Sequence, residues 1–174
     1  EADYQDVVKK KATMKDQCYD PYCSLLIDGC LENGKDMLQG GSECPMHWSV
    51  YAYGIGTVAD SLCAVKKFIF DEKKITMEEM YDALQKNFEG YEEMQAMLLK
   101  ETPSYGNGID EVDDIANDVL SHFNEAVMDL NKKAKTDKFV STLFGYFFHI
   151  YHGEIAGATP DGRMKGEAFS DSMG

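Results

Sequence analysis

The chain has 174 residues, of which 44% are hydrophobic, and a formal net charge of -14 from 31 acidic and 17 basic residues. This composition suffices for a soluble globular domain with a hydrophobic core, and no apolar run is long enough to cross a membrane. Because so acidic a surface repels phosphate backbones, nucleic acid is excluded as a partner.

The cysteines point to a reducing compartment. There are five of them, an odd number without the compact spacing of a disulfide framework, so the cytoplasm is the expected location. Zinc and iron–sulfur sites need paired short spacings, which are absent from Cys18, Cys23, Cys30, Cys44 and His47. We therefore predict packed free thiols and no metal site.

The first thirty residues predict little regular structure. Residues 1–15 carry only a partial helical stripe, at Val7, Val8, Ala12 and Met14, typical of the tail of a helix. Pro21 is expected to break any helix that reaches it, and Ser24 to cap a short helix over residues 25–27.

Residues 24–67 concentrate glycines, polar groups and thiols within otherwise helical sequence. The pair Gly40-Gly41 precedes Ser42, Glu43, Cys44 and His47, and residues 51–56 resemble a strand that ends in glycine and leads into a helix near Thr57. Paired glycines permit positive φ and close backbone approach. Because a loop held between a strand and a helix is a common place for binding groups, we expect the chemistry of the chain here.

The middle of the chain predicts a series of scaffold helices. The helix from Thr57 is expected to bury Val58, Leu62, Val65 and Ile69 and to pack Cys63. A capping box at residues 76–79 opens a helix that Gly90 closes, and residues 92–100 form another. After a loop at residues 103–108, Asp110 is expected to cap a long helix whose apolar face carries Ile115, Val119, Phe123, Val127 and Leu130.

The C-terminal part predicts a strand and a turn. Residues 139–151 are rich in aromatic and β-branched side chains, which favours a buried strand with His149 and His152 on opposite faces. Residues 153–163 carry the composition of a turn. Arg163 is a candidate for a buried ion pair or for recognising a carboxylate, although the turn alone also explains this segment.

Several motifs, in register along nearly the whole chain, resemble the glycyl radical enzymes of the pyruvate formate-lyase superfamily. They are Ser24-Leu25-Leu26, Asp28, Cys30, Glu32, Gly34-Lys35-Asp36, Gly40-Gly41, Gly56 to Leu62, Lys66-Lys67, Phe70 to Lys73, Thr76 to Glu79, Asn87 to Gly90, Tyr105-Gly106-Asn107 and Ala158 to Arg163.

This resemblance implies an α/β fold, namely a helix-rich segment of the ten-stranded α/β barrel of these enzymes. Residues 1–174 would be an internal part of that barrel domain, and the absence of an initiator Met also leads us to expect a piece of a longer chain. In the family, an iron–sulfur activase that uses S-adenosylmethionine installs a radical on a C-terminal glycine, which passes it to a loop cysteine. We expect both residues to lie outside this segment, which would be inactive by itself.

The Gly-Cys-x-Glu pattern at residues 29–32 resembles the family's radical loop. The residues that follow it resemble a later stretch, however, so we interpret Cys30 as structural and Glu32 as part of a short polar helix end. The site prediction instead centres on Glu43 as the catalytic carboxylate, with Ser42, His47 and Trp48 binding substrate. Burial in an apolar barrel would raise the pKa of Glu43. The alternatives are a solvated Glu43 and a hydrogen-bonded core His47.

Within the family, residues 42–48 are more similar to 4-hydroxyphenylacetate decarboxylases than to diol dehydratases or choline trimethylamine-lyases. The resemblance thus implies radical decarboxylation of an arylacetate to p-cresol, with an activating enzyme and a small iron–sulfur subunit as partners. A dehydratase or a carbon–nitrogen lyase of the same family is the alternative. A non-enzymatic acidic interaction domain is a second alternative.

Overall fold

A computed structural model describes residues 17–44, 47–134, 138–143 and 147–171 and the single positions 6, 9, 10 and 13. The partial stripe predicted at residues 1–15 rests on side chains outside these residues. The chain divides into two compact units, which are described separately here. Unit 1 comprises Glu1–Trp48 and Leu130–Val140, and unit 2 comprises Ser49–Asp129 and Ser141–Gly174.

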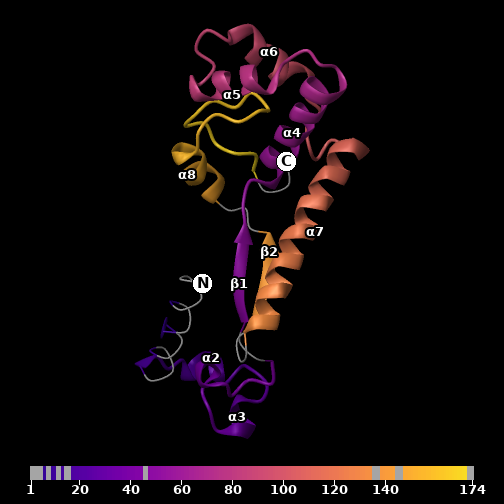
Figure 1. The fold of residues 1–174 in the computed structure, drawn as a ribbon. Helices are drawn as coiled ribbons and strands as arrows, with labels where there is room; N and C mark the ends of the chain where they lie inside the picture. Colours follow the sequence, from indigo (N-terminus) through magenta and orange to yellow (C-terminus); the bar gives the residue numbers. More distant parts are fainter. Residues whose placement is uncertain are drawn as a thin grey trace. The chain divides into compact units, whose positions relative to one another are not determined.

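The described elements are mostly helical (Figure 1). In chain order they are α2 (Pro21–Ser24), α3 (Cys30–Asn33), the 3₁₀ helix η1 (Met37–Gln39), β1 (His47–Ala52), α4 (Ile55–Ala64), the π-helix η2 (Val65–Asp71), α5 (Met77–Gln85), α6 (Glu92–Glu101), α7 (Asp110–Lys133), β2 (Lys138–Leu143) and α8 (Phe148–Ile155).

The strands β1 and β2 pair in a two-stranded sheet. Their arrows run the same way in Figure 1, so the pair is parallel, and the helices from α4 to α7 form the connection between them. Parallel neighbours require such a long crossover, usually a helical one. The predicted mixed helix and strand class, rich in helix, is therefore confirmed.

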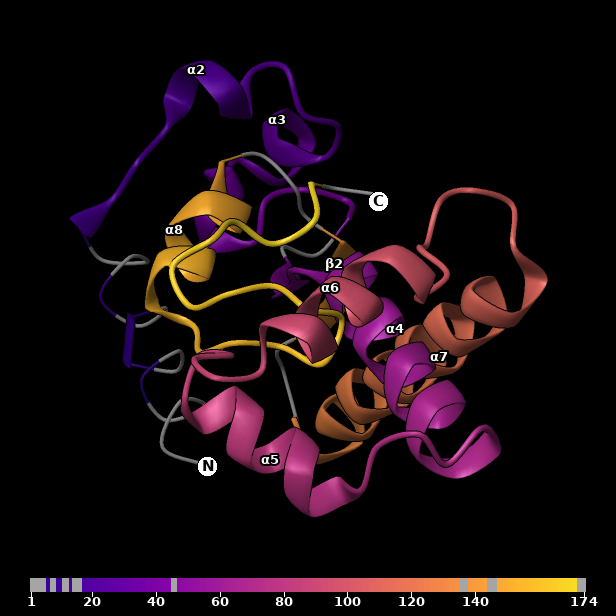
Figure 2. The same ribbon diagram turned by 90° about the horizontal axis from the view of Figure 1, so that it is seen from above.

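Unit 2 contains two hydrophobic clusters that share α4. One joins Ala64 and Phe68 to α5 and α6 through Met80, Phe88 and Leu98. The other joins Ile55, Ala59 and Cys63 to Val112 and Ala116 of α7. Figure 2 shows α4 beside α7, as this second cluster requires. The predicted packing of Cys63 is confirmed, because its side chain is 1% exposed.

Three helix predictions agree with the structure in large part. Thr76 Oγ1 accepts a hydrogen bond from Glu79 N at 3.1 Å, and the Glu79 carboxylate accepts one from Thr76 N at 2.8 Å, which confirms the capping box. The helices α6 and α7 occupy the predicted ranges. On α7, however, the buried side chains are Val112, Ala116 and Val127, and only Val127 belongs to the predicted face.

The predicted buried face of α4 is wrong at Val58 and Leu62, which are exposed, whereas Ile55, Ala59 and Cys63 are buried. Ile69, which belongs to the same predicted face, lies in η2 and is partly buried against the first cluster. The helix also begins at Ile55 rather than near Thr57. The helix therefore packs on Val112 and Ala116 of α7 through a face that the predicted stripe did not include.

Two further predictions of local structure are wrong. In place of a helix over residues 25–27 capped by Ser24, α2 begins at Pro21, where the missing N–H costs nothing, and is capped by the Asp20 carboxylate. Residues 18–20 are not helical, as expected before Pro21. The strand expected over residues 139–151 ends at Leu143 in β2, and α8 begins at Phe148. His149 and His152 consequently lie on a helix rather than on opposite faces of a strand.

Candidate functional site

The double-glycine loop is held against the start of α3 by close backbone contacts within unit 1. A Cβ at Gly41 would lie 2.0 Å from the Lys35 carbonyl oxygen, and a Cβ at Gly29, whose φ is +91°, would lie 2.6 Å from Glu43 N. Glu43 N donates to the Asp28 carbonyl at 2.9 Å. Glycine is thus required at both contacts, and the backbone of Glu43 is fixed.

A polar clip around Asp36 orders the other side of this loop. The Asp36 carboxylate lies 2.8 Å from Asp20 N, 2.9 Å from Ser24 Oγ and 2.9 Å from Leu38 N. Partial burial opposes ionisation, but these three donors outweigh it and lower the pKa of Asp36 below its ordinary value. The loop between α2 and η1 is therefore held by an ionised carboxylate.

The structure separates the predicted site residues into two pairs along the chain. Ser42 and Glu43 lie on the loop, where Ser42 Oγ donates to the Cys44 carbonyl at 2.5 Å and the Glu43 side chain is exposed. His47 and Trp48 begin β1. His47 is exposed, whereas Trp48 Nε1 is buried and has no hydrogen-bond partner among the described residues.

Cys30 and Glu32 have structural roles that agree with our interpretation. The Cys30 side chain is 3% exposed, and Glu32 Oε2 accepts a hydrogen bond from Gly29 N at 3.1 Å at the start of α3. Glu32 thus caps the first turn of the helix, where a carboxylate is favoured by the helix dipole.

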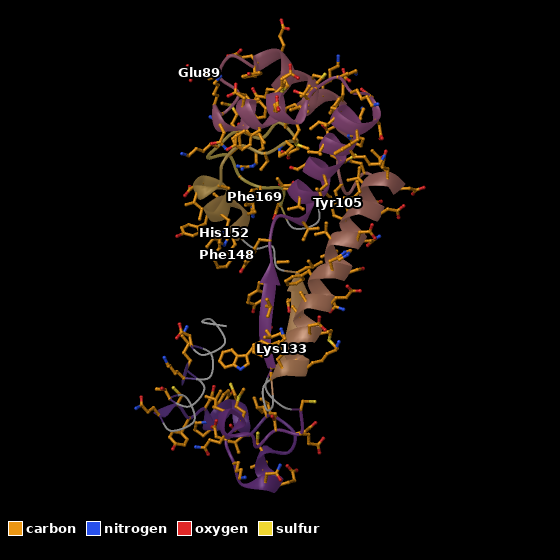
Figure 3. The ribbon with its side chains drawn as sticks, viewed as in Figure 1. Glu89, Tyr105, Lys133, Phe148, His152 and Phe169 are labelled. Carbon is orange, nitrogen blue, oxygen red and sulfur yellow. The ribbon has the colours of Figure 1, made fainter. Side chains whose placement is uncertain are left out.

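An aromatic cluster on α8 belongs to unit 2. The ring of His152 lies 5.0 Å from that of Tyr53, and the ring of Phe148 lies 5.4 Å from Tyr53. Figure 3 shows Phe148 and His152 together on α8, with Phe169 nearby. His149 Nδ1 lies 3.4 Å from the Asp171 carboxylate.

Sequence reasoning missed Asp60, a half-buried carboxyl group of α4. Its Oδ1 accepts a hydrogen bond from Tyr105 N at 2.7 Å, which attaches the loop between α6 and α7 to α4. Burial raises the pKa of Asp60 to about 6, and the negative charge of Asp161 adds to the rise. Among the described residues, this is the carboxyl group whose pKa is raised closest to neutral.

The Arg163 side chain is buried among main-chain carbonyls, and the described residues give its guanidinium no ion pair. Its side chain is 6% exposed, and its guanidinium donates to the carbonyls of Gly157, Met164 and Glu167, the last at 2.6 Å. The carbonyl of Gly153 lies at 3.5 Å, and the ring of Phe169 covers the guanidinium at 4.6 Å. Arg163 therefore organises the backbone of residues 153–169. The turn predicted over residues 153–163 is confirmed at residues 159–162 by the hydrogen bond from Gly162 N to the Thr159 carbonyl, whereas Gly153 to Ile155 belong to α8.

Two further observations bear on the kind of site. Within the described residues, no group of three or more His, Cys, Asp or Glu side chains could hold a metal ion. No helix of the described chain is both long and apolar enough to cross a membrane.

Residues 7–153 match the family described as pyruvate formate lyase-like. The chain belongs to this family. It is 36% identical over 157 residues to trans-4-hydroxy-L-proline dehydratase of Clostridioides difficile, covering 88% of this chain and 19% of the relative. It is 38% identical over 159 residues to isethionate sulfite-lyase of Bilophila wadsworthia, covering 87% of this chain and 18% of the relative.

Solved structures of the family carry the same fold. The hydroxyproline dehydratase of Clostridioides difficile, solved with trans-4-hydroxy-L-proline bound, superposes with a TM-score of 0.78 at 32% identity, over 92% of this chain and 20% of that one. Similarity to a decarboxylase is lower: indoleacetate decarboxylase of Tractidigestivibacter scatoligenes is 28% identical over 86% of this chain and 20% of the relative. The chain thus spans about a fifth of the length of the relatives it matches.

Proposed function

We propose that these residues form part of the barrel wall of a glycyl radical lyase that eliminates a leaving group from a small hydroxylated or sulfonated substrate. The observation that carries the proposal is the 36% identity to trans-4-hydroxy-L-proline dehydratase along 88% of the chain. The similarity to isethionate sulfite-lyase supports the same class, because both relatives are named for an elimination. Family membership favours this enzyme over the acidic interaction domain.

The radical would be installed by an S-adenosylmethionine-dependent activase on a glycine elsewhere in a polypeptide of family length, located in the cytoplasm. The radical would supply hydrogen-atom abstraction from the substrate. The residues of this chain would supply polar groups to the substrate. We assign Glu43 to proton transfer or to holding a substrate hydroxyl, and Ser42, His47 and Trp48 to substrate binding.

The local geometry supports a positioned Glu43. Its backbone is fixed by the hydrogen bond to Asp28 and by the fit against Gly29, and its carboxylate is exposed, so it is accessible to a substrate or to a neighbouring segment. Trp48 Nε1 is a buried donor without a partner in the described residues, and buried donors are normally satisfied. A substrate oxygen is a suitable acceptor for it.

The test uses the family-length polypeptide with its activating enzyme. After activation, trans-4-hydroxy-L-proline, isethionate and 1,2-diols are offered in turn, and the eliminated product is measured. We expect turnover of one substrate of this class and a loss of at least about tenfold in kcat for Glu43→Gln. Glu89→Gln changes an equally exposed carboxylate of unit 2, labelled in Figure 3, and is expected to leave turnover unchanged. Absence of a radical after activation would refute the proposal.

A second candidate is decarboxylation of an arylacetate such as 4-hydroxyphenylacetate, with a small iron–sulfur subunit. Its support is the loop of residues 42–48 and the 28% identity to indoleacetate decarboxylase. Release of carbon dioxide from 4-hydroxyphenylacetate by the activated enzyme, without elimination activity, would favour this candidate over the first.

A further inference from the structure

Three aromatic side chains lie at the carboxyl-terminal edge of the β1–β2 pair. Because the two strands run in the same direction, their carboxyl ends lie at the same edge. Tyr53 directly follows β1, and α8, which carries Phe148 and His152, is the first described element after β2. All three residues belong to unit 2. Ligands of parallel α/β sheets and barrels bind at this edge of the strands, so it is the favoured position for a binding group in unit 2.

These three residues form a compact group, which we call the α8 ring cluster. The ring centroid of His152 lies 5.0 Å from that of Tyr53 and 6.0 Å from that of Phe148, and the Tyr53 and Phe148 centroids lie 5.4 Å apart. These are the distances of packed aromatic pairs. All three side chains are half-buried, and Figure 3 shows Phe148 and His152 together on α8. Since the rings pack against one another, their edges are what they offer to a ligand.

His152 is the member of the α8 ring cluster with an unused polar edge. Its ring nitrogens have no hydrogen-bond or ion-pair partner among the described residues, and its ring contacts there are with Tyr53, Phe148 and Tyr151. The neighbouring His149 differs, because its Nδ1 lies 3.4 Å from the Asp171 carboxylate. An imidazole has an N–H donor in each of its protonation states. His152 therefore presents a hydrogen-bond donor within an aromatic surrounding.

Phe169 holds the two sides of the α8 ring cluster together. Its backbone N donates to the His149 carbonyl in α8 at 3.2 Å. Its ring lies 3.3 Å from the position that a Cβ at Gly54, the residue after Tyr53, would take. The orientation of His152 relative to Tyr53 is thus set by the fold. A donor that is already held in place loses less conformational entropy when a ligand binds.

We propose that His152 donates a hydrogen bond to the carboxylate or sulfonate group of the substrate. This inference rests on the proposed function, which supplies the substrate class. The two relatives described above are named for trans-4-hydroxy-L-proline, which carries a carboxylate, and for isethionate, which is a sulfonate. Hydrogen bonds to an ionised acceptor are stronger than those to a neutral one. His152 therefore favours a substrate that bears an oxyanion over a neutral diol.

The experiment measures binding to the family-length polypeptide before activation, so that no radical is required. Isethionate, trans-4-hydroxy-L-proline and 1,2-propanediol are titrated in turn by isothermal calorimetry. We expect at least one of the two oxyanions to bind, with a Kd weakened about ten- to a hundredfold in His152→Phe, which keeps an aromatic ring and removes the donor. His122→Phe, the same change at an exposed position of α7, should leave the Kd unchanged. An unchanged Kd in His152→Phe, or binding of the diol alone or of none of the three, would overturn the proposal.

The wild-type protein provides an independent test if His152→Phe does not fold. Diethyl pyrocarbonate modifies accessible imidazoles, and tandem mass spectrometry reports the modification of each histidine. With isethionate or trans-4-hydroxy-L-proline at about ten times its Kd, labelling of His152 should slow about tenfold by mass action. Labelling of the exposed His122 should not change. Equal labelling of His152 with and without the bound oxyanion would overturn the proposal.

Turnover after activation separates this inference from the proposed function. Oxyanion binding that depends on His152, without elimination after activation, would refute the proposed function and leave the His152 contact standing. Elimination from isethionate or trans-4-hydroxy-L-proline, together with an unchanged Kd in His152→Phe, would refute the His152 contact alone.

Discussion

Replacing Asp60 with Asn should stabilise the protein at neutral pH. The Asp60 carboxyl is half-buried, and its pKa is raised from 3.8 to about 6, mainly by burial. Asn retains an oxygen that accepts the hydrogen bond from Tyr105 N and removes the charge that burial disfavours. The raised pKa corresponds to at most about 3 kcal/mol, and because solvent reaches part of the group we expect about 1–2 kcal/mol.

The pH dependence follows from the direction of this shift. The folded protein binds the Asp60 proton more tightly than the unfolded chain does, so the resulting stability is present below pH 3.8 and is lost as the pH rises through about 6. The advantage of Asp60→Asn should therefore be largest above about pH 7 and shrink as the pH falls from 6 toward 3.8.

The assay is urea denaturation followed by circular dichroism at several pH values. Asp114→Asn, at an exposed position of α7, is the control and should show no comparable pH-dependent gain. Asp60→Ala should be about 1 kcal/mol less stable than Asp60→Asn, because Tyr105 N then loses its acceptor. Asp60→Asn less stable than wild type at pH 7.5, or equally improved at pH 4.5, would refute the reasoning.

Three further substitutions have defined outcomes. Arg163→Lys should destabilise unit 2 by about 2–4 kcal/mol in urea denaturation, because a single ammonium cannot reach all the carbonyls that the guanidinium contacts. A loss of stability below about 1 kcal/mol would contradict this expectation. Gly41→Ala should speed hydrogen exchange of residues 34–44, because its Cβ would meet the Lys35 carbonyl. Gly157→Ala is the control and should be tolerated, because its Cβ would meet nothing within 4 Å. Equal effects of the two substitutions would refute the close contact at Gly41. Thr76→Ala should lower the thermal midpoint through a loss of about 1 kcal/mol, and Thr76→Ser should not.

The sequence predicted correctly those helices whose start is determined by a few neighbouring residues. The capping box at Thr76 and Glu79 and the acidic start of α7 are complete within a few residues, and both helices are found where expected. The prediction for α4 failed at Val58 and Leu62 because it began the helix near Thr57. The helix begins at Ile55 and buries Ile55, Ala59 and Cys63 against α7.

The candidate site was predictable only in part. The close fit of Gly41 agrees with the expectation that the pair Gly40-Gly41 admits a close backbone approach, whereas the fit of Gly29 was not predicted. Asp60 was missed because its partner is a main-chain N–H of a loop 45 residues away, and the role of Arg163 was misjudged because its partners are main-chain carbonyls. The catalytic role of Glu43 stays a prediction, since its side chain is exposed rather than buried as expected.

The carbonyl contacts of Arg163 have a consequence for how freely residues 153–169 can vary. A carbonyl oxygen is the same atom in every amino acid, so most positions of this segment can change side chain without losing a partner of the guanidinium. The exceptions are positions whose side chain contacts the guanidinium or whose backbone requires glycine. Thr159 Oγ1 accepts a hydrogen bond from Arg163 Nε at 3.1 Å, and the Phe169 ring covers the guanidinium. A Cβ would lie 2.3 Å from the Glu167 carbonyl at Gly153 and would meet Leu99 at Gly162, and Gly166 has a φ of +90°. A library randomised across the segment should therefore retain Gly153, Thr159, Gly162, Arg163, Gly166 and Phe169 and vary elsewhere.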